Sequence, residues 1–350
     1  MLITEILKEP ERFRACVNQG LPYKLLSVKI KIVDKCNLRC KMCSHWRHYV
    51  EALPFDFYKP VIKDLVELGC QKIHFTGGEP MLYPNLLSLI DFIRQCDDNI
   101  KISMTTNATL IDEEMAKVLA QSGLKRANIS IDSPEESIHD SIRGVHGAFR
   151  KACYGFQCLR KHMPKRPFYI NTVLSPWNYK TLIGLPKLAN ELGATGVNLQ
   201  SLNIHTVDSF PFTAPQWDEI NKDILPGFLD EANKYHIPID IPQISSSADG
   251  CYNNHRCYVL YSHLLINYLG FVYPCCNLTN TRMGDLHKHS IKEIWQGDKY
   301  QKLRQKQQLP IHPKCATCDL CIDDNIEIDK LFEQSISAPI CHVEERTGGP

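Results

Sequence analysis

The chain has 350 residues, of which 43% are hydrophobic and 23% charged, an ordinary composition for one large or two modest globular domains. Its 40 basic and 39 acidic side chains leave a formal net charge of +1, a field too weak to make nucleic acid or an anionic membrane the main partner. No apolar run approaches the roughly 18 residues that a membrane span needs.

Cysteine is the unusual residue of this composition, with 16 copies. Residues 1–20 carry charge throughout and lack the apolar stretch of a secretion signal. We therefore expect a reducing, cytoplasmic location, in which the cysteines serve metal or redox chemistry rather than disulfides.

Strand-like and helix-like segments alternate through the first two thirds of the chain, after one short amphipathic helix in residues 1–22. Six such units indicate parallel βαβ connections. A full eight-unit barrel typically needs about 250 residues, so six units predict an α/β fold with a partial (β/α)6 TIM-like barrel and a site at the carboxyl ends of its strands. The predicted strands are 26–33, 72–75, 101–105, 126–131, 168–174 and 196–202, and the predicted helices are 56–68, 86–95, 112–121, 147–162 and 181–192.

The alternation stops near residue 205, where prolines become frequent around a predicted helix at 216–235. A cysteine-rich segment follows, with a predicted hairpin turning at Gly270 and a predicted helix at 290–305. We therefore divide the chain into an N-terminal helix (1–22), the partial barrel (23–205), a linker with a helix (206–250), a small cysteine-rich domain (251–325) and a tail (326–350).

The strongest motif is C-x3-C-x2-C, formed by Cys36, Cys40 and Cys43 just after the first predicted strand. Thiolate sulfur suits iron–sulfur clusters, and three ligands leave one iron of a [4Fe–4S] cluster without protein coordination. Loops after barrel strands carry the active sites of such folds. The alternatives are three structural cysteines or part of a zinc site.

This motif resembles the signature of the radical S-adenosylmethionine (radical SAM) superfamily, although Met42 occupies a position that is usually aromatic. The resemblance implies a [4Fe–4S] cluster whose open iron binds SAM. It further implies reductive cleavage of SAM to a 5′-deoxyadenosyl radical, which abstracts hydrogen from a substrate, with a reductant such as flavodoxin or ferredoxin as partner.

Four further segments occur in the order that this family expects, three of them at the ends of predicted strands, although each alone is compatible with a structural turn. GGEP at 77–80 resembles the family's GGEP motif, and TTN at 105–107 its TNG-type motif with alanine in place of glycine. SIDS at 130–133 resembles a SAM-contacting position, and RGVHGAF at 143–149 the RGxxGxF segment of relatives with auxiliary clusters. The resemblance implies that the SAM contacts are Gly77, Gly78, Glu79, Asn107, Ser130 and Arg143.

A second group of cysteines lies near the C-terminus. Cys257 and Cys275 flank the predicted hairpin in a C-x12-G-x4-C pattern, and Cys315 and Cys318 form a C-x2-C pair. A hairpin brings its flanking residues together, and such a set can hold either an iron–sulfur cluster or zinc. The layout resembles the Twitch and SPASM auxiliary-cluster domains of radical SAM enzymes, which implies that these four cysteines ligate one auxiliary [4Fe–4S] cluster.

Cysteines outside both sets leave room for further roles. Cys321 and Cys341 have no assigned role, and too few extra cysteines remain for a second auxiliary cluster. Cys251 and Cys276 flank the auxiliary site, and either is a candidate hydrogen donor to a substrate radical, the alternative being a packed thiol.

A single auxiliary cluster resembles that of aminocyclitol dehydrogenases. This resemblance implies an enzyme that abstracts hydrogen from a small polyol, sugar or aminoglycoside-type substrate, an aminocyclitol-like molecule among them. Oxidation, epimerisation and dehydration are the possible outcomes. The alternatives are a maturase acting on a peptide or protein substrate and a non-enzymatic iron–sulfur electron-transfer protein.

Overall fold

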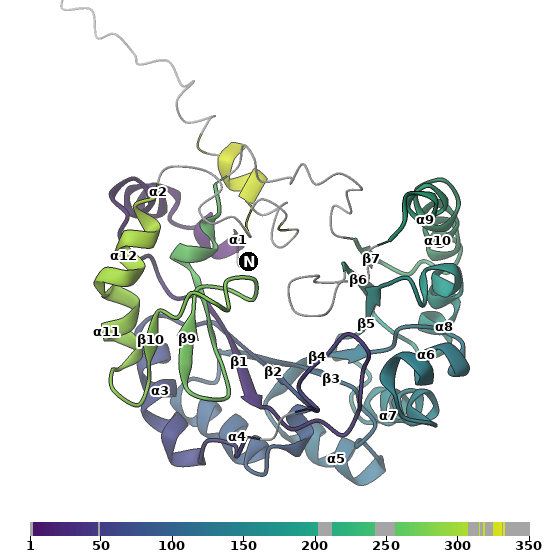
Figure 1. The fold of residues 1–350 in the computed structure, drawn as a ribbon. Coiled ribbons are helices and arrows are strands. Elements are labelled where there is room, and N and C mark those ends of the chain that lie inside the picture. The colour runs from purple at the N-terminus through teal and green to yellow at the C-terminus, as the bar shows by residue number, and fades with distance from the viewer. Residues whose placement is uncertain are drawn as a thin grey trace, which may run out of the picture.

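The centre of the molecule is a curved parallel sheet whose strands follow one another in chain order (Figure 1). The structure is a computed structural model that describes residues 3–47, 50–201, 212–241, 256–306, 315, 318, 325–330 and 332. The six strands predicted for the partial barrel are confirmed. They are β1 Ser27–Val33, β2 Lys72–Gly77, β3 Lys101–Thr106, β4 Leu124–Ser130, β5 Phe168–Leu174 and β6 Gly196–Ser201.

Helices cover the outer side of this sheet and bury the apolar faces of its strands (Figure 1). The strand connections contain α3 Phe55–Glu67, α4 Leu86–Cys96, α5 Glu113–Gln121, α6 Glu136–Arg143, α7 Ala148–His162, α8 Leu185–Glu191 and the 3₁₀ turns η1 Pro80–Leu82 and η2 Tyr179–Gly184. The predicted helix at 181–192 therefore begins as a 3₁₀ turn. Helix α6 was not predicted, because three of its four buried residues are polar and give no apolar helical pattern.

The N-terminal region forms two helices rather than the single helix predicted, α1 Ile3–Ile6 and α2 Pro10–Gln19. Proline lacks an N–H and is favoured in the first turn of a helix, so Pro10 separates them. Helix α2 ends where predicted, because Gly20 adopts a left-handed conformation with φ +66°.

After β6, the described chain resumes with a continuous helical run that confirms the helix predicted at 216–235. It consists of α9 Ala214–Glu219, one π-helical turn (η3) at Ile220–Ile224 and α10 Leu225–Lys234. The two-residue strand β7 Ile239–Asp240 then pairs with β6; it was too short to be predicted. Within the described residues, no helix combines the length and apolarity needed to cross a bilayer.

The predicted C-terminal hairpin is confirmed, and it is part of the barrel sheet. Strands β8 His263–Ile266 and β9 Phe271–Tyr273 are antiparallel, and Gly270 turns between them with φ +77°. The 3₁₀ turn η4 Tyr258–Tyr261 precedes β8, and β10 Gly284–Asp285 pairs with β9. Because β8 pairs in parallel with β1, the sheet has ten strands in the order β10-β9-β8-β1-β2-β3-β4-β5-β6-β7.

The last helices pack against the same core. The helix predicted at 290–305 is interrupted at Gly297, giving α11 Ile291–Gln296 and α12 Asp298–Arg304. The buried Arg304 side chain donates hydrogen bonds to the carbonyls of Leu260 and Trp295, which attaches α12 to the turn before β8. The predicted domain boundaries at 205 and 250 lie outside the described residues.

Candidate functional site

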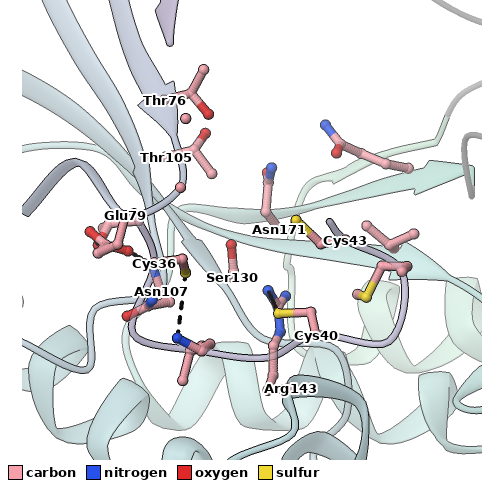
Figure 2. A pocket seen from close by; sticks show the side chains of 17 residues that line it. Cys36, Cys40, Cys43, Thr76, Glu79, Thr105, Asn107, Ser130, Arg143 and Asn171 are labelled. Carbon is pink, nitrogen blue, oxygen red and sulfur yellow. Dashed lines mark hydrogen bonds between the residues drawn. The ribbon is translucent and has the colours of Figure 1, made fainter. Parts of the chain in front are cut away.

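The loop that follows β1 carries Cys36, Cys40 and Cys43, and the three side chains line one cavity at the carboxyl ends of the strands (Figure 2). Cys40 is buried, whereas Cys36 and Cys43 are partly exposed. The cavity is also lined by all six residues predicted to contact SAM, namely Gly77, Gly78, Glu79, Asn107, Ser130 and Arg143. The fold therefore brings together residues that are up to about a hundred positions apart in the chain.

The two glycines of the GGEP segment pack against the start of the cysteine loop. A Cβ atom on Gly77 would lie 2.2 Å from the Val33 carbonyl oxygen, and one on Gly78 would lie 2.1 Å from the Lys35 carbonyl oxygen. The Gly78 N–H donates to the Val33 carbonyl over 2.8 Å, and the Glu79 N–H donates to the Lys35 carbonyl over 2.9 Å. These glycines thus permit a close approach to the chain's own backbone, in addition to the approach to a ligand that the sequence suggested.

The end of α6 holds the other side of the cysteine loop. The N–H groups of Arg39 and Lys41 donate to the carbonyls of Arg143 and Ile142, both over 2.9 Å. Gly144 has φ +69°, and a Cβ atom there would lie 2.4 Å from the Arg39 carbonyl oxygen. The first glycine of the RGxxGxF segment is therefore required by contact with the loop that bears the cysteines.

A ring of three side chains attaches the same loop to the end of β3. The Asn37 amide donates to the Thr109 hydroxyl over 2.7 Å, and that hydroxyl donates to Oδ1 of Asn107 over 2.7 Å. The Asn107 amide closes the ring by donating to Oδ1 of Asn37 over 2.9 Å. Asn107 therefore positions the loop between the first two cysteines, a role that sequence reasoning missed.

Arg143 lies under the cysteine loop, next to Cys40 (Figure 2). Its Nε is 2.7 Å from Oδ2 of the fully buried Asp132, and its Nη1 is 3.7 Å from the Cys40 sulfur. Burial alone would lower the pKa of Arg143, but the charges of Asp132 and Cys40 raise it above its usual value. The guanidinium thus stays charged beside a sulfur of the motif. For its partner Asp132, the only signal in the sequence is its place in the SIDS segment.

Glu79 is buried and accepts three hydrogen bonds within the protein. Its Oε1 accepts from the Thr106 hydroxyl over 2.6 Å and from the Met81 N–H over 3.1 Å, and its Oε2 accepts from the Asn107 N–H over 2.8 Å. Burial raises the pKa of Glu79, and these donors partly oppose the shift. A carboxylate offers about four acceptor positions, so Oε2 retains capacity for one further donor such as the SAM ammonium.

The far wall of the cavity consists of neutral polar side chains from the later strands. Ser130 ends β4, Asn171 lies on β5 and Gln200 lies on β6, and all three line the cavity. Figure 2 shows the Ser130 hydroxyl and the Asn171 amide pointing into this space. The Asn198 amide donates to Oδ1 of Asn171 over 2.8 Å, which fixes the orientation of that amide.

The three cysteines of the first motif meet the requirements of an iron–sulfur site. Burial raises the pKa of Cys36 to about 11 and raises that of Cys40, so both are protonated thiols when no metal is present. Metal binding displaces such protons, and the Arg143 cation offsets the charge of the resulting thiolate. The soft sulfur donors and the adjacent cation therefore fit the [4Fe–4S] cluster that the sequence predicts.

The second cysteine set is also brought together. Burial raises the pKa of Cys257 well above its usual value, and the neighbouring thiols of Cys275, Cys315 and Cys318 raise it further. The Asn277 amide donates to the Cys318 sulfur over 3.1 Å. All four predicted auxiliary ligands therefore share one environment, and their soft sulfur donors suit an iron–sulfur cluster. Among the described residues, no three of these sulfurs lie within 4.8 Å of one another, which is wider than the spacing around a single zinc ion.

Of the cysteines outside the two sets that the sequence analysis singled out, Cys276 lies within the described residues. The Cys276 sulfur accepts a hydrogen bond from the Lys29 ammonium over 3.2 Å, which places it at the inner side of β1. Cys251, Cys321 and Cys341 lie outside the described residues.

The Glu79 contacts generate a stability prediction. Glu79→Gln turns one acceptor oxygen into a donor that faces another donor, so we expect the free energy of unfolding to fall by about 1–3 kcal/mol. Thr106→Ser keeps the hydroxyl and is the matched control, with an expected loss below about 1 kcal/mol. Urea unfolding of the apoprotein followed by circular dichroism measures both. Equal stability of Glu79→Gln and the wild type would show that the carboxylate does not organise these strand ends.

Comparison with known proteins agrees with the geometry. The Radical SAM superfamily profile matches residues 30–209, just over half of the chain, and the SPASM profile, an iron–sulfur cluster-binding domain, matches residues 257–319. The AdoMet-dependent heme synthase of Nitratidesulfovibrio vulgaris is 34% identical over 167 residues, which cover 47% of this chain and 44% of that protein. The GTP 3′,8-cyclase of Clostridium perfringens is 32% identical over 171 residues, covering 47% of this chain and 51% of that protein.

The match with these two curated relatives thus spans about half of their length or less. The structure of Streptococcus suis SuiB bound to the precursor peptide SuiA shares the fold with a TM-score of 0.67 and 16% identity, covering 90% of this chain and 76% of SuiB. Members of the superfamily bind a [4Fe–4S] cluster and SAM, and SPASM regions bind auxiliary iron–sulfur clusters. The chain therefore belongs to the radical SAM superfamily and carries a C-terminal SPASM region.

Proposed function

We propose that this radical SAM enzyme abstracts hydrogen from a small polyol, sugar or aminoglycoside-type substrate. The observation that carries the proposal is the single cavity in which the three motif cysteines and all six predicted SAM contacts meet neutral polar side chains of β5 and β6. Amides such as those of Asn171 and Gln200 both donate and accept hydrogen bonds, which suits a substrate rich in hydroxyl groups.

Each set of residues has a separate role in this proposal. Cys36, Cys40 and Cys43 hold the first [4Fe–4S] cluster, and Cys257, Cys275, Cys315 and Cys318 hold one auxiliary cluster. When bound and reduced, the first cluster supplies the electron that cleaves SAM to methionine and a 5′-deoxyadenosyl radical, which removes a hydrogen atom from the substrate. Flavodoxin or ferredoxin in the cytoplasm is the proposed reductant.

The protein residues orient SAM and exclude competing reactions. Glu79 offers its remaining acceptor position to the SAM ammonium, and Ser130 and Arg143 lie where they can contact the carboxylate or ribose. Gly77, Gly78 and Asn107 shape the cavity wall through their contacts with the cysteine loop. Placement of the reacting atoms by such contacts selects the outcome of the chemistry.

A substrate radical can lose an electron to give a ketone, regain hydrogen on the opposite face to give an epimer, or expel a neighbouring hydroxyl. Hydrogen return requires a free thiol that faces the substrate. Cys276 lies beside Lys29 at the inner side of β1 but does not line the cavity of the cysteine motif, so it can serve as donor to a substrate that extends from this cavity along β1. We therefore favour epimerisation, with Cys276 as donor and Cys251 as the second candidate, over oxidation and dehydration.

The second candidate function is modification of a peptide or protein. It is favoured by the fold shared with SuiB, whose structure was solved with a precursor peptide. The electron-transfer alternative predicts no 5′-deoxyadenosine at all, so the following experiment separates it from both enzymatic functions.

Replacing Cys36, Cys40 and Cys43 together by alanine removes the ligands of the first cluster. We expect 5′-deoxyadenosine formation from SAM to be abolished, and bound iron to fall from about eight to about four atoms per chain. Chromatography of reactions with dithionite and iron analysis measure both. Cys153→Ala on α7 is the control and should change neither. A triple variant that still makes 5′-deoxyadenosine, or zinc in the second cysteine set, would contradict the assignment.

The fate of the substrate radical is tested in deuterated water. Candidate sugars and polyols are incubated with holoenzyme, SAM and reductant, and the products are analysed by mass spectrometry and NMR. We expect deuterium at one carbon of the product, because an exchangeable thiol hydrogen is transferred, and its loss in Cys276→Ala but not in Cys96→Ala. A ketone without deuterium incorporation would instead establish oxidation.

A further inference from the structure

Strand β1 presents lysines to the interior of the barrel. Lys29 and Lys31 alternate with Val28, Ile30 and Ile32, which are buried in the apolar core between sheet and helices. In the parallel register Lys31 is paired with Thr76 of β2, and paired residues of neighbouring strands lie on the same face. Because Thr76 lines the cavity of the cysteine motif, the Lys31 side chain lies on the cavity side of the sheet.

The six barrel strands carry positive charges that no acidic residue of the same strands balances. Strands β1 to β6 contain no aspartate or glutamate, yet they contain the basic residues Lys29, Lys31, Lys72, Lys101, Lys125 and Arg126. Burial lowers the pKa of His74 on β2 well below its usual value, and the charges of Lys29, Lys72 and Arg126 lower it further. Lys29, Lys72 and Arg126 therefore act on a common space at the inner side of the sheet, and the histidine among them is neutral. Lys101 and Lys125 are exposed.

Two of the inward-facing cations, Lys29 and Arg126, have partners within the barrel. Lys29 donates to the Cys276 sulfur. Arg126 donates to Oδ1 of Asn128 over 3.1 Å, and its guanidinium lies 3.9 Å from the centre of the Tyr169 ring. Lys31 differs, since its side chain makes no hydrogen bond and no ion pair with any residue in the part of the chain that the structure describes.

The described surroundings of Lys31 give it no ion pair. Burial lowers its pKa, the neighbouring Cys276, Cys43 and Asp34 oppose the shift, and Lys29 adds to it. Asp34 itself is paired with His45, whose Nδ1 is 2.5 Å from Oδ1 of Asp34. A half-buried ammonium without a partner is costly, and an anionic group that binds beside it removes that cost.

We infer that the substrate of this enzyme carries a phosphate or carboxylate group, which Lys31 binds inside the barrel between the two cysteine sets. This inference rests on the proposed function, because it takes the substrate to occupy the cavity of the cysteine motif. It narrows the proposed class to acidic members, such as sugar phosphates or sugar acids. It also disfavours aminoglycosides, because the inner cations Lys31, Lys72 and Arg126 would repel their ammonium groups.

The test measures anion binding to the reconstituted, SAM-loaded holoenzyme, so that the SAM site is already filled. Inorganic pyrophosphate and citrate serve as probes, myo-inositol is the neutral control, and calorimetry under anaerobic conditions at constant ionic strength gives the Kd. We expect pyrophosphate or citrate to bind the wild type, and the tighter of the two identifies phosphate or carboxylate as the preferred group. Myo-inositol should bind more weakly than either.

Lys31→Gln should weaken binding of the preferred probe at least tenfold, since it removes a charge-assisted hydrogen bond. Lys31→Arg keeps the charge and should stay within about threefold of the wild type. Lys63→Gln, an exposed lysine on α3, is the matched control and should not change the Kd. Equal weakening by Lys63→Gln, or unchanged binding by Lys31→Gln, would overturn the inference.

Two further measurements separate this inference from its alternatives. If Lys31→Gln shifts the midpoint potential of a cluster but leaves probe binding unchanged, the lysine serves the clusters and the inference is wrong. Formation of 5′-deoxyadenosine from SAM and dithionite without substrate is expected in the wild type and in Lys63→Gln. If the wild type forms no 5′-deoxyadenosine, the proposed function is wrong. If the wild type forms 5′-deoxyadenosine but binds neither pyrophosphate nor citrate, only this inference is wrong.

Discussion

The site depends on one steric constraint, the contact of the cysteine loop's backbone with the segments that follow β2 and α6. At Gly77, Gly78 and Gly144 a single Cβ atom would overlap a carbonyl oxygen of Val33, Lys35 or Arg39, at distances of 2.2, 2.1 and 2.4 Å. The loop can bring its three sulfurs to one cavity only because these positions lack side chains. Hydrogen bonds from Asn107 and to Arg143 fix the loop further, so residues that the family associates with SAM also position the cysteines.

A second constraint is the pairing of β8 with β1, which makes the C-terminal hairpin part of the barrel sheet. Cys275 and Cys276 follow β9. Because of the β8–β1 pairing, Cys276 comes within hydrogen-bond distance of Lys29 on β1, the strand that leads to the first cysteine motif. The inner lysines of β1 consequently lie between the two cysteine sets, and both Cys43 and Cys276 act on Lys31. Both proposals depend on this arrangement, in which Cys43, Cys276 and Lys31 lie near one another at the inner side of β1.

The barrel strands and the two cysteine sets could be predicted from the sequence, because each is marked by a pattern of neighbouring residues. Six strands were recognisable from short apolar segments bounded by helical patterns, and the motif cysteines from their spacing. The β8–β1 pairing joins residues more than 230 positions apart through four paired positions, and no local pattern encodes it. The Asp132–Arg143 ion pair and the Asn37–Thr109–Asn107 ring are likewise tertiary contacts. The alternating lysines of β1 were visible in the sequence, but only the register showed that they face the cavity.

The central claim is that the cysteine loop forms a cluster site open to SAM, whereas the C-terminal cysteines form a closed site. Electron paramagnetic resonance of the reduced holoenzyme, recorded with and without SAM, tests this claim most directly. We predict two iron–sulfur signals, of which one changes its g values when SAM is added and disappears in the Cys36, Cys40 and Cys43 variant, while the other is unchanged. A SAM-insensitive spectrum, or a SAM response that survives in that variant, would contradict the account.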